Sequence, residues 1–150
     1  MPWVPHITVA SIIQKENKFL FVEEYVKNNI VLNQPAGHLE ENETIEEGCI
    51  RETLEETAYQ VKVDYLIGIY QERSKGALDM WLRFCFKCTI QEEFTDKELD
   101  KNIIRKVWLT KDEILMPEKK LRSEMVTKCI YDYEGGKKYP KEIINSLLEK

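Results

Sequence analysis

The chain contains 150 residues, of which 43% are hydrophobic and 33% are charged, a composition typical of a folded domain with a sizeable core. The net charge of −5 argues against generic binding to nucleic acids or anionic membranes. No apolar run reaches the roughly 18 residues of a transmembrane helix, and the N-terminus lacks the pattern of a signal peptide. We therefore predict one domain over residues 1–150, in the cytoplasm, with a small molecule rather than nucleic acid or membrane as its partner.

The first part of the chain combines strand patterns with one helix pattern. Alternating and β-branched residues predict extended segments at residues 6–14, 19–26 and 30–34. Residues 44–58 have helical spacing, with Thr44 as the N-cap and Glu47 three residues later to complete a capping box. The core-facing side of this helix is predicted to carry Ile45, Cys49, Ile50 and Leu54.

The second part continues the interleaving of strands and helices. Strands are predicted at residues 61–70, 80–91 and 103–109, and helices at 111–116 and 122–134. A last helix is predicted around an apolar group formed by Ile143, Ile144, Leu147 and Leu148. This order predicts an α/β class with a mixed sheet between helical layers.

Cys85 and Cys88 form a C-x-x-C pair, which raises the possibility of zinc binding or redox chemistry. They lie in a predicted strand, where positions three apart point to opposite faces of the sheet. The sequence contains no second C-x-x-C pair. We therefore predict buried, reduced thiols.

A dense group of carboxylates marks the predicted helix at residues 44–58. Glu52, Glu55 and Glu56 have the i, i+3 and i+4 spacing that places side chains on one helical face, and Arg51 precedes them. Glu43 stands at the helix entrance. Oxygen ligands this close together suit Mg²⁺ or Mn²⁺, although an acidic helix face is also a common solvated surface. The fixed spacing from Gly37 through these residues favours the metal site.

The set Gly37, Glu43, Arg51, Glu52, Glu55 and Glu56 resembles the Nudix box, the signature of hydrolases that cleave phosphoanhydrides linked to another moiety. The resemblance implies an α/β/α sandwich and a Mg²⁺ cofactor, with Mn²⁺ as the alternative. Two positions depart from the usual pattern. Ala58 replaces a glycine and predicts a different helix exit, and Thr53 replaces an aliphatic residue.

Within this pattern, Glu52 and Glu56 are the predicted direct metal ligands, and Glu55 is a further ligand or proton acceptor. Arg51 is expected to hold the geometry of the cluster by pairing with Glu47 or Glu55. The resemblance also implies a backbone carbonyl ligand, assigned to Ala36. A general base from outside the box is sought at Glu98 or Asp100, for which a solvated loop is the alternative interpretation.

Short pieces outside the box are similar to the NudJ-type subgroup of the family: residues 5–10, 33–40, 82–84, 121–123 and 135–140. This resemblance implies release of inorganic phosphate from nucleoside tri- and diphosphates, and action on thiamine diphosphate and its pyrimidine diphosphate precursor. An ADP-ribose or dinucleotide pyrophosphatase and a non-catalytic binding module are the alternatives. The sequence leaves open whether the protein is a monomer or a homodimer.

Four residues are predicted to contact substrate, each with a structural alternative. Gly37 lies in the loop before the helix, and the adjacent His38 either touches substrate or packs against that loop. Arg83 and Arg122 are predicted to bind phosphate oxygens, with surface ion pairs as the alternative for both.

Overall fold

The computed structural model describes residues 3–74 and 78–148. Its central sheet has the strand order β5 (Ala36–His38), β1 (His6–Ile12), β7 (Met80–Glu93) and β6 (Tyr59–Arg73). β1 runs parallel to β7, and the other pairs are antiparallel, so the predicted mixed sheet is confirmed. β1 is buried over its last five residues because it lies inside this sheet with packed layers on both faces.

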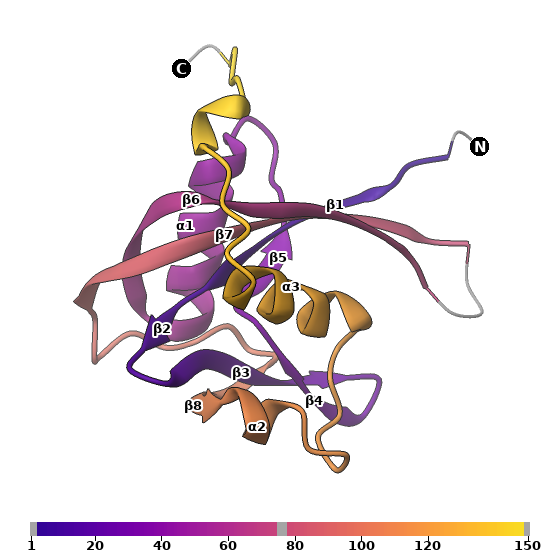
Figure 1. Ribbon diagram of the computed structural model, residues 1–150, viewed down its shortest axis with the longest axis vertical. Helices are drawn as coiled ribbons and strands as arrows, with labels where there is room; N and C mark the ends of the chain where they lie inside the picture. The colour runs from indigo at the N-terminus through magenta and orange to yellow at the C-terminus, as the bar shows by residue number, and fades with distance from the viewer. Residues whose placement is uncertain (1–2, 75–77, 149–150) are drawn as a thin grey trace.

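A second, antiparallel sheet lies beside the first (Figure 1). In it, β3 (Lys18–Val26) pairs with β2 (Gln14–Lys15), β4 (Asn29–Asn33) and β8 (Ile103–Thr110). The sequence pattern predicted β3, β4 and β8, but it assigned Gln14 to the preceding strand and did not predict a separate sheet. Residue 13 alone separates β1 of the first sheet from β2 of the second, so the chain passes directly from one sheet to the other.

Helices cover the two faces of the mixed sheet. On one face, Cys49 of α1 (Ile45–Thr57) packs in a core cluster with Val9, Val61 and Cys88. On the other, α3 (Glu124–Glu134) contributes to a second cluster; its members include Ala10, Ile12, Cys85, Val126, Cys129 and Ile130. The α/β/α arrangement is thus confirmed, and the two thiols of the C-x-x-C pair are buried on opposite faces of the sheet, as predicted.

α1 begins as its sequence predicts and directs most of its predicted face to the core, since Cys49 is buried and Ile45 and Ile50 pack against its cluster. The Thr44 hydroxyl accepts a hydrogen bond from the Glu47 N–H at 3.0 Å, and the Glu47 carboxylate accepts one from the Thr44 N–H at 2.8 Å. The fully buried face is formed by Cys49, Thr53 and Thr57 rather than by Leu54. Thr53 can be buried because its hydroxyl donates a hydrogen bond to the Cys49 carbonyl at 2.8 Å.

The predicted change of helix exit at Ala58 is wrong. Ala58 takes the left-handed conformation (φ 64°) that glycine adopts more readily, and its N–H donates to the Leu54 carbonyl at 2.9 Å. This conformation costs an alanine about 1 kcal/mol. The residue is buried, and its carbonyl accepts a hydrogen bond from the N–H of Phe94, so the segment that follows β7 holds the turn in place.

The C-terminal third agrees with the sequence at its first two helices and differs at the last. The predicted short helix at 111–116 and long helix at 122–134 are confirmed as α2 (Lys111–Ile114) and α3. The predicted last helix is wrong. A single 3-10 turn, η1 (Lys141–Ile143), follows the backbone pairing of Tyr139 with Leu66, and Ile144 is the residue of the predicted apolar group that packs against the core.

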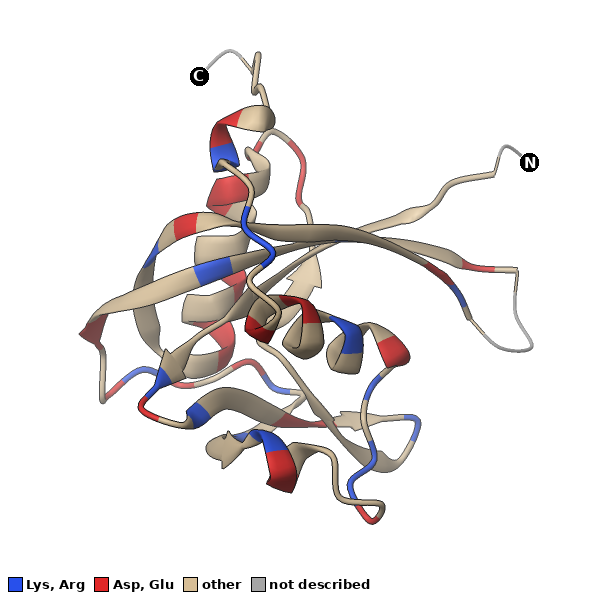
Figure 2. Ribbon diagram, viewed as in Figure 1, with Lys and Arg blue, Asp and Glu red and all other residues tan. Residues whose placement is uncertain are grey.

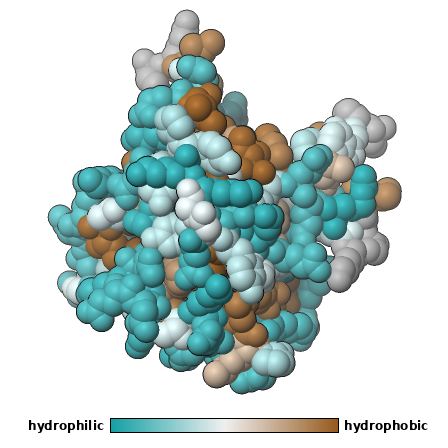
Figure 3. All heavy atoms as spheres, viewed as in Figure 1, coloured by the Kyte–Doolittle hydropathy of each residue, from teal (hydrophilic) through white to brown (hydrophobic). Residues whose placement is uncertain are grey.

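The surface is mostly polar on the face shown in Figure 3, with hydrophobic side chains in small separate groups. Within the described residues, every helix is too short or too polar to traverse a lipid bilayer.

We expect Thr44→Ala to lower the free energy of unfolding by about 1 kcal/mol, because it removes the oxygen that caps the Glu47 N–H. Urea denaturation measures this change. Thr44→Ser is the matched control, since it keeps the capping oxygen and should unfold close to wild type. An unchanged midpoint for Thr44→Ala would show that this capping box adds nothing to stability.

Candidate active site

Arg51 is the centre of the acidic group on α1. Its Nε and Nη2 donate to both oxygens of Glu43, at 2.9 and 2.7 Å. Its Nη1 donates to Glu52 at 2.8 Å and to Glu55 at 3.2 Å, and Nη2 also donates to the His38 carbonyl at 2.9 Å. The predicted pairing with Glu55 is therefore present, and Arg51 also joins the helix to the loop before it.

This network changes the acidity of its members. The hydrogen bonds from Arg51 hold the pKa of Glu43 below its usual value. The same carboxylates raise the pKa of Arg51, which stays charged. Burial raises the pKa of Glu52, against the opposing effect of Arg51. One guanidinium thus serves four carboxylates, since Glu40 also lies 3.4 Å from its Nε, and it leaves an excess of negative charge, visible as acidic positions along α1 in Figure 2.

The compact oxygen group contains Glu52, Glu55 and Asp100, each of which contributes one carboxylate oxygen within 4.8 Å of the other two. The Asp100 N–H donates to the Glu55 carbonyl at 3.0 Å, which ties its loop to the end of α1. Of the two candidate bases outside the box, the structure therefore brings Asp100 to the cluster and leaves the exposed Glu98 outside it. Three hard oxygen donors in this arrangement fit a divalent ion such as Mg²⁺ or Mn²⁺.

Glu56 lies deeper than the other carboxylates. It is 6% exposed, and it accepts a hydrogen bond from the Ala36 N–H at 3.0 Å. Burial raises its pKa to about 9. Glu56 is therefore neutral near pH 7 until a cation or a donor compensates its charge. The loop contributes the N–H of Ala36 here, and the carbonyl role of that residue stays a prediction.

Gly37 allows the loop to approach the helix. A Cβ built on Gly37 would lie 2.1 Å from Cδ of Glu52. Among the described glycines, only Gly136 has a positive φ, so Gly37 is required for close approach and not for an unusual backbone conformation. Only a residue without a side chain leaves room for the Glu52 carboxylate at this position.

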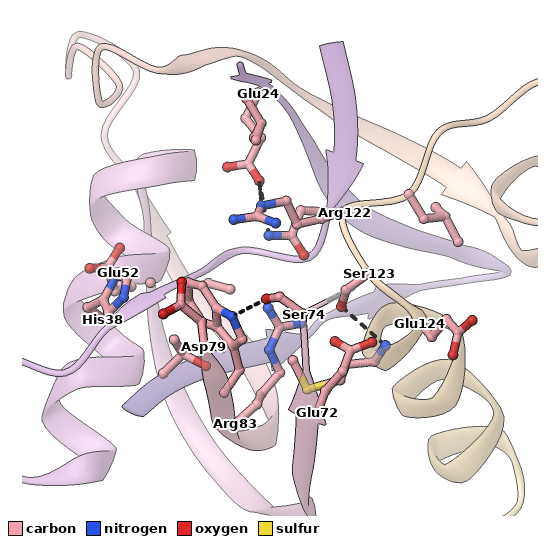
Figure 4. Close-up of a pocket in the computed structure, with 18 of the residues that line it drawn as sticks. Glu24, His38, Glu52, Glu72, Ser74, Asp79, Arg83, Arg122, Ser123 and Glu124 are labelled. Carbon is pink, nitrogen blue, oxygen red and sulfur yellow. Dashed lines mark hydrogen bonds and ion pairs between the residues drawn. The ribbon is translucent and has the colours of Figure 1, made fainter. Parts of the chain in front are cut away.

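A cavity of about 1090 Å³ opens beside these groups (Figure 4). Its lining includes all four residues predicted to contact substrate, together with Ala36, Glu52 and Glu56. Arg83 is only 5% exposed, so the alternative of a surface ion pair is wrong for this residue. Arg122 does form an ion pair, with Glu24 at 3.7 Å, and it precedes α3 rather than lying within it.

His38 is held by neighbours on the rim of this cavity. Its Nε2 lies 3.1 Å from Nδ1 of His6, whose ring stacks on Trp81 at 4.1 Å. Burial, followed by the nearby His6, lowers the pKa of His38, so its ring is neutral at pH 7. The ring thus contacts His6 and Trp81 rather than the loop, and it lines the cavity.

Sequence reasoning missed two residues of this region: Glu24, which lines the cavity, and Gln34, which holds Arg83. Gln34 is fully buried and accepts a hydrogen bond from Arg83 at 2.8 Å. Glu24 accepts one from Asn33 at 3.1 Å, and burial raises its pKa. Gln34 lies directly before the segment 35–37 that leads into the box, and this position could have identified it from the sequence as a residue of the site. Glu24 lies beside Glu23 in β3, after an apolar run, and its sequence position gave no such signal.

A NUDIX domain model matches residues 4–129. The chain belongs to the Nudix family. It is 36% identical to Phosphatase NudJ of Escherichia coli strain K12 over 143 residues, which cover 95% of this chain and 92% of that protein. The same values hold for Phosphatase NudJ of Shigella flexneri.

A solved NUDIX hydrolase from Nitrosomonas europaea has 40% identity and a TM-score of 0.92, and the match covers 95% of this chain and 97% of that one. The NUDIX domain of Shewanella oneidensis NrtR, solved with ADP ribose, has 13% identity and a TM-score of 0.66; this match covers 88% and 90% of the two chains and shows the fold alone. The family, the fold and the site geometry agree that this chain is a Nudix hydrolase.

We expect Gly37→Ala to reduce kcat/KM by roughly 10²-fold, because the new methyl group displaces the Glu52 carboxylate. Steady-state kinetics measure the loss, and urea denaturation of the same variant tests whether the fold is retained. Wild-type activity in a folded Gly37→Ala protein would show that the position of Glu52 does not control turnover.

The raised pKa of Glu56 predicts how the stability of the metal-free hydrolase depends on pH. Folded Glu56 keeps a proton up to a pKa of about 9, whereas the unfolded chain releases it near the ordinary value of 4.5. The contribution is therefore fully present below the unfolded pKa and is lost as pH rises through the folded pKa.

The contribution of Glu56 to the free energy of unfolding changes by at most about 1.4 kcal/mol per pH unit. Urea unfolding in a chelator, across this pH range, measures the trend. Glu56→Gln is the control, because its amide does not titrate and the Glu56 part of the slope should disappear. Equal slopes for wild type and Glu56→Gln would contradict the assignment of a raised pKa to Glu56.

Proposed function

We propose that this Nudix hydrolase is a divalent-metal-dependent phosphatase that releases inorganic phosphate from nucleoside tri- and diphosphates. We further propose thiamine diphosphate, or its hydroxymethylpyrimidine diphosphate precursor, as a substrate. The observation that carries this proposal is the 36% identity to Phosphatase NudJ over 95% of the chain. The cavity beside the carboxylate cluster supports it, because three arginines, Arg73, Arg83 and Arg122, line its wall.

The residues that would hold the metal are Glu52, Glu55 and Asp100, joined by the deeper Glu56 and by the Ala36 carbonyl. Mg²⁺ is the expected ion and Mn²⁺ the alternative. A bound divalent ion would neutralise phosphate oxygens and lower the pKa of an attacking water. Binding would require Glu56 to lose its proton, so metal affinity should rise with pH.

The protein's own groups have distinct roles in this proposal. Arg51 positions Glu52 and Glu55 through its hydrogen bonds. Whichever of Glu55 and Asp100 does not bind the metal accepts the proton of the attacking water, since both are less enclosed than Glu56. Arg83 and Arg122 bind phosphate oxygens, and His38 borders the substrate.

The two alternatives have less support. A solved ADP-ribose pyrophosphatase from Streptococcus suis and the NrtR domain with ADP ribose are 14% and 13% identical to this chain, and they share its fold alone. A non-catalytic binding module would be expected to lack box carboxylates. Here Glu52, Glu55 and Glu56 are all present, and Arg51 holds the first two in place.

A substrate screen tests the proposal. We expect free phosphate from thiamine diphosphate and from nucleoside di- and triphosphates, and little nucleoside monophosphate from ADP-ribose. Phosphate detection and product chromatography measure these outcomes. Glu52→Gln should lower kcat by about 10²-fold or more, because a neutral amide is a poorer ligand for a divalent cation.

Glu41→Gln is the matched control, since this exposed glutamate lies outside the oxygen cluster. Monophosphate from ADP-ribose as the main product would favour the pyrophosphatase. Binding of these compounds without turnover of any of them would favour the non-catalytic module.

A further inference from the structure

Arg83 is a buried cation without an anionic partner in the described part of the chain. It lies on β7, paired to β1 at Thr8 and to β6 at Tyr70, in the interior of the mixed sheet. It is 5% exposed, and Glu24, whose pKa burial raises and Arg83 lowers through space, forms its ion pair with Arg122 instead. Burying a guanidinium is costly unless a counter-charge compensates it, so this position calls for an anion.

The hydrogen bond of Arg83 goes to a neutral and rigid partner. Its Nη1 donates to Oε1 of Gln34 at 2.8 Å. The Gln34 amide is fixed in turn, because its Nε2 donates to the Ser11 carbonyl and to Cys85 Sγ, both at 3.3 Å. Gln34 therefore orients the guanidinium without neutralising it.

Two buried side-chain atoms among the described residues lack a hydrogen-bond partner: Arg83 Nε and Asn33 Oδ1. Both residues line the cavity beside the carboxylate cluster. In Figure 4, Arg83 extends from its strand into the space between Glu52 on one side and Ser123 and Glu124 on the other. Unpartnered buried groups on one cavity wall indicate a missing ligand.

We infer that Arg83 binds the terminal phosphate of the substrate and thereby selects the bond that is cleaved. Its Nε and Nη2 form a fork that matches two phosphate oxygens. Asn33 Oδ1 accepts a hydrogen bond from a protonated phosphate oxygen or from water. This inference rests on the proposed function and adds to it the residue that recognises the end of the substrate.

The charge and the position of Arg83 favour a terminal group. A terminal phosphate carries up to two negative charges, whereas each phosphate within a dinucleotide-type diphosphate carries one. A deeply buried cation is also reached more readily by a compact chain end than by a phosphate substituted on both sides. Water then adds to the terminal phosphorus, the bridging P–O bond breaks, the rest of the substrate leaves with the bridging oxygen, and the proton of the water passes to a carboxylate.

The direct test uses inorganic phosphate and the metal-free protein. Millimolar phosphate should raise the melting temperature of wild type by a few degrees, through binding to the folded state. Arg83→Met should lose this rise. Without phosphate it should melt close to wild type, because removal of an uncompensated buried charge offsets the lost bond to Gln34.

Arg105→Met is the matched control. Arg105 pairs with Glu23 at 2.7 Å across β3 and β8 and does not line the cavity, so its phosphate response should equal that of wild type. Arg83→Lys keeps the charge and removes the fork, so phosphate should raise its melting temperature less than that of wild type. If Arg83→Met does not fold, this variant tests the inference. A full phosphate response in either folded Arg83 variant would overturn the inference.

Kinetics provide a second readout. Inorganic phosphate should inhibit wild type competitively, and Arg83→Met should weaken this inhibition about tenfold or more. The variant should lose kcat/KM for diphosphates with a free end and retain any residual action on ADP-ribose. An equal loss on both substrate types would overturn the selection of the terminal bond. Because phosphate binding is measured without turnover, failure of the proposed activity would not be confused with failure of this inference.

Discussion

The site depends on the hydrogen bonds of one guanidinium. If Arg51 were absent, the carboxylates of Glu52 and Glu55 on α1 and of Glu43 just before it would repel one another. Arg51 is itself partly enclosed, so its interactions are less weakened by water than those of an exposed surface pair. Its bond to the His38 carbonyl extends this control to the loop that borders the cavity. The carboxylates are therefore arranged before any ligand arrives.

The mixed sheet supplies the rigid frame for this arrangement. β1 pairs with β5 at Val9 and Gly37, and this register places the loop against Glu52. The Asp100 loop is held from the other side by its hydrogen bond to the end of α1. β5 and α1, which are neighbours in the sequence, thus meet the distant Asp100 loop at one cluster because each segment is attached to the sheet or to the helix that covers it. Precise placement of charged groups on rigid elements is what metal-assisted chemistry requires.

Local sequence signals predicted what local interactions determine. The capping box at Thr44, the i, i+3 and i+4 spacing of the glutamates and the alternation that separates Cys85 from Cys88 each act over a few residues. Non-local choices were not predictable. Asp100 and Glu98 have similar sequence surroundings, and the hydrogen bond to the Glu55 carbonyl distinguishes them. The left-handed Ala58 follows from its contact with the segment after β7, which overrides the local cost of the conformation.

The cavity has two unsatisfied charges of opposite sign, and their combination constrains the ligand. Glu52 and the buried Glu56 line the cavity beside the rest of the carboxylate cluster and favour a cation, while Arg83 favours an anion in the same space. The two groups do not pair with each other, because Glu56 accepts from Ala36 and Arg83 donates to Gln34. A free phosphate would satisfy only Arg83, and a free metal ion would satisfy only the glutamates. A metal-bound phosphate compensates both at once, so the electrostatics of the cavity select the complex over either component.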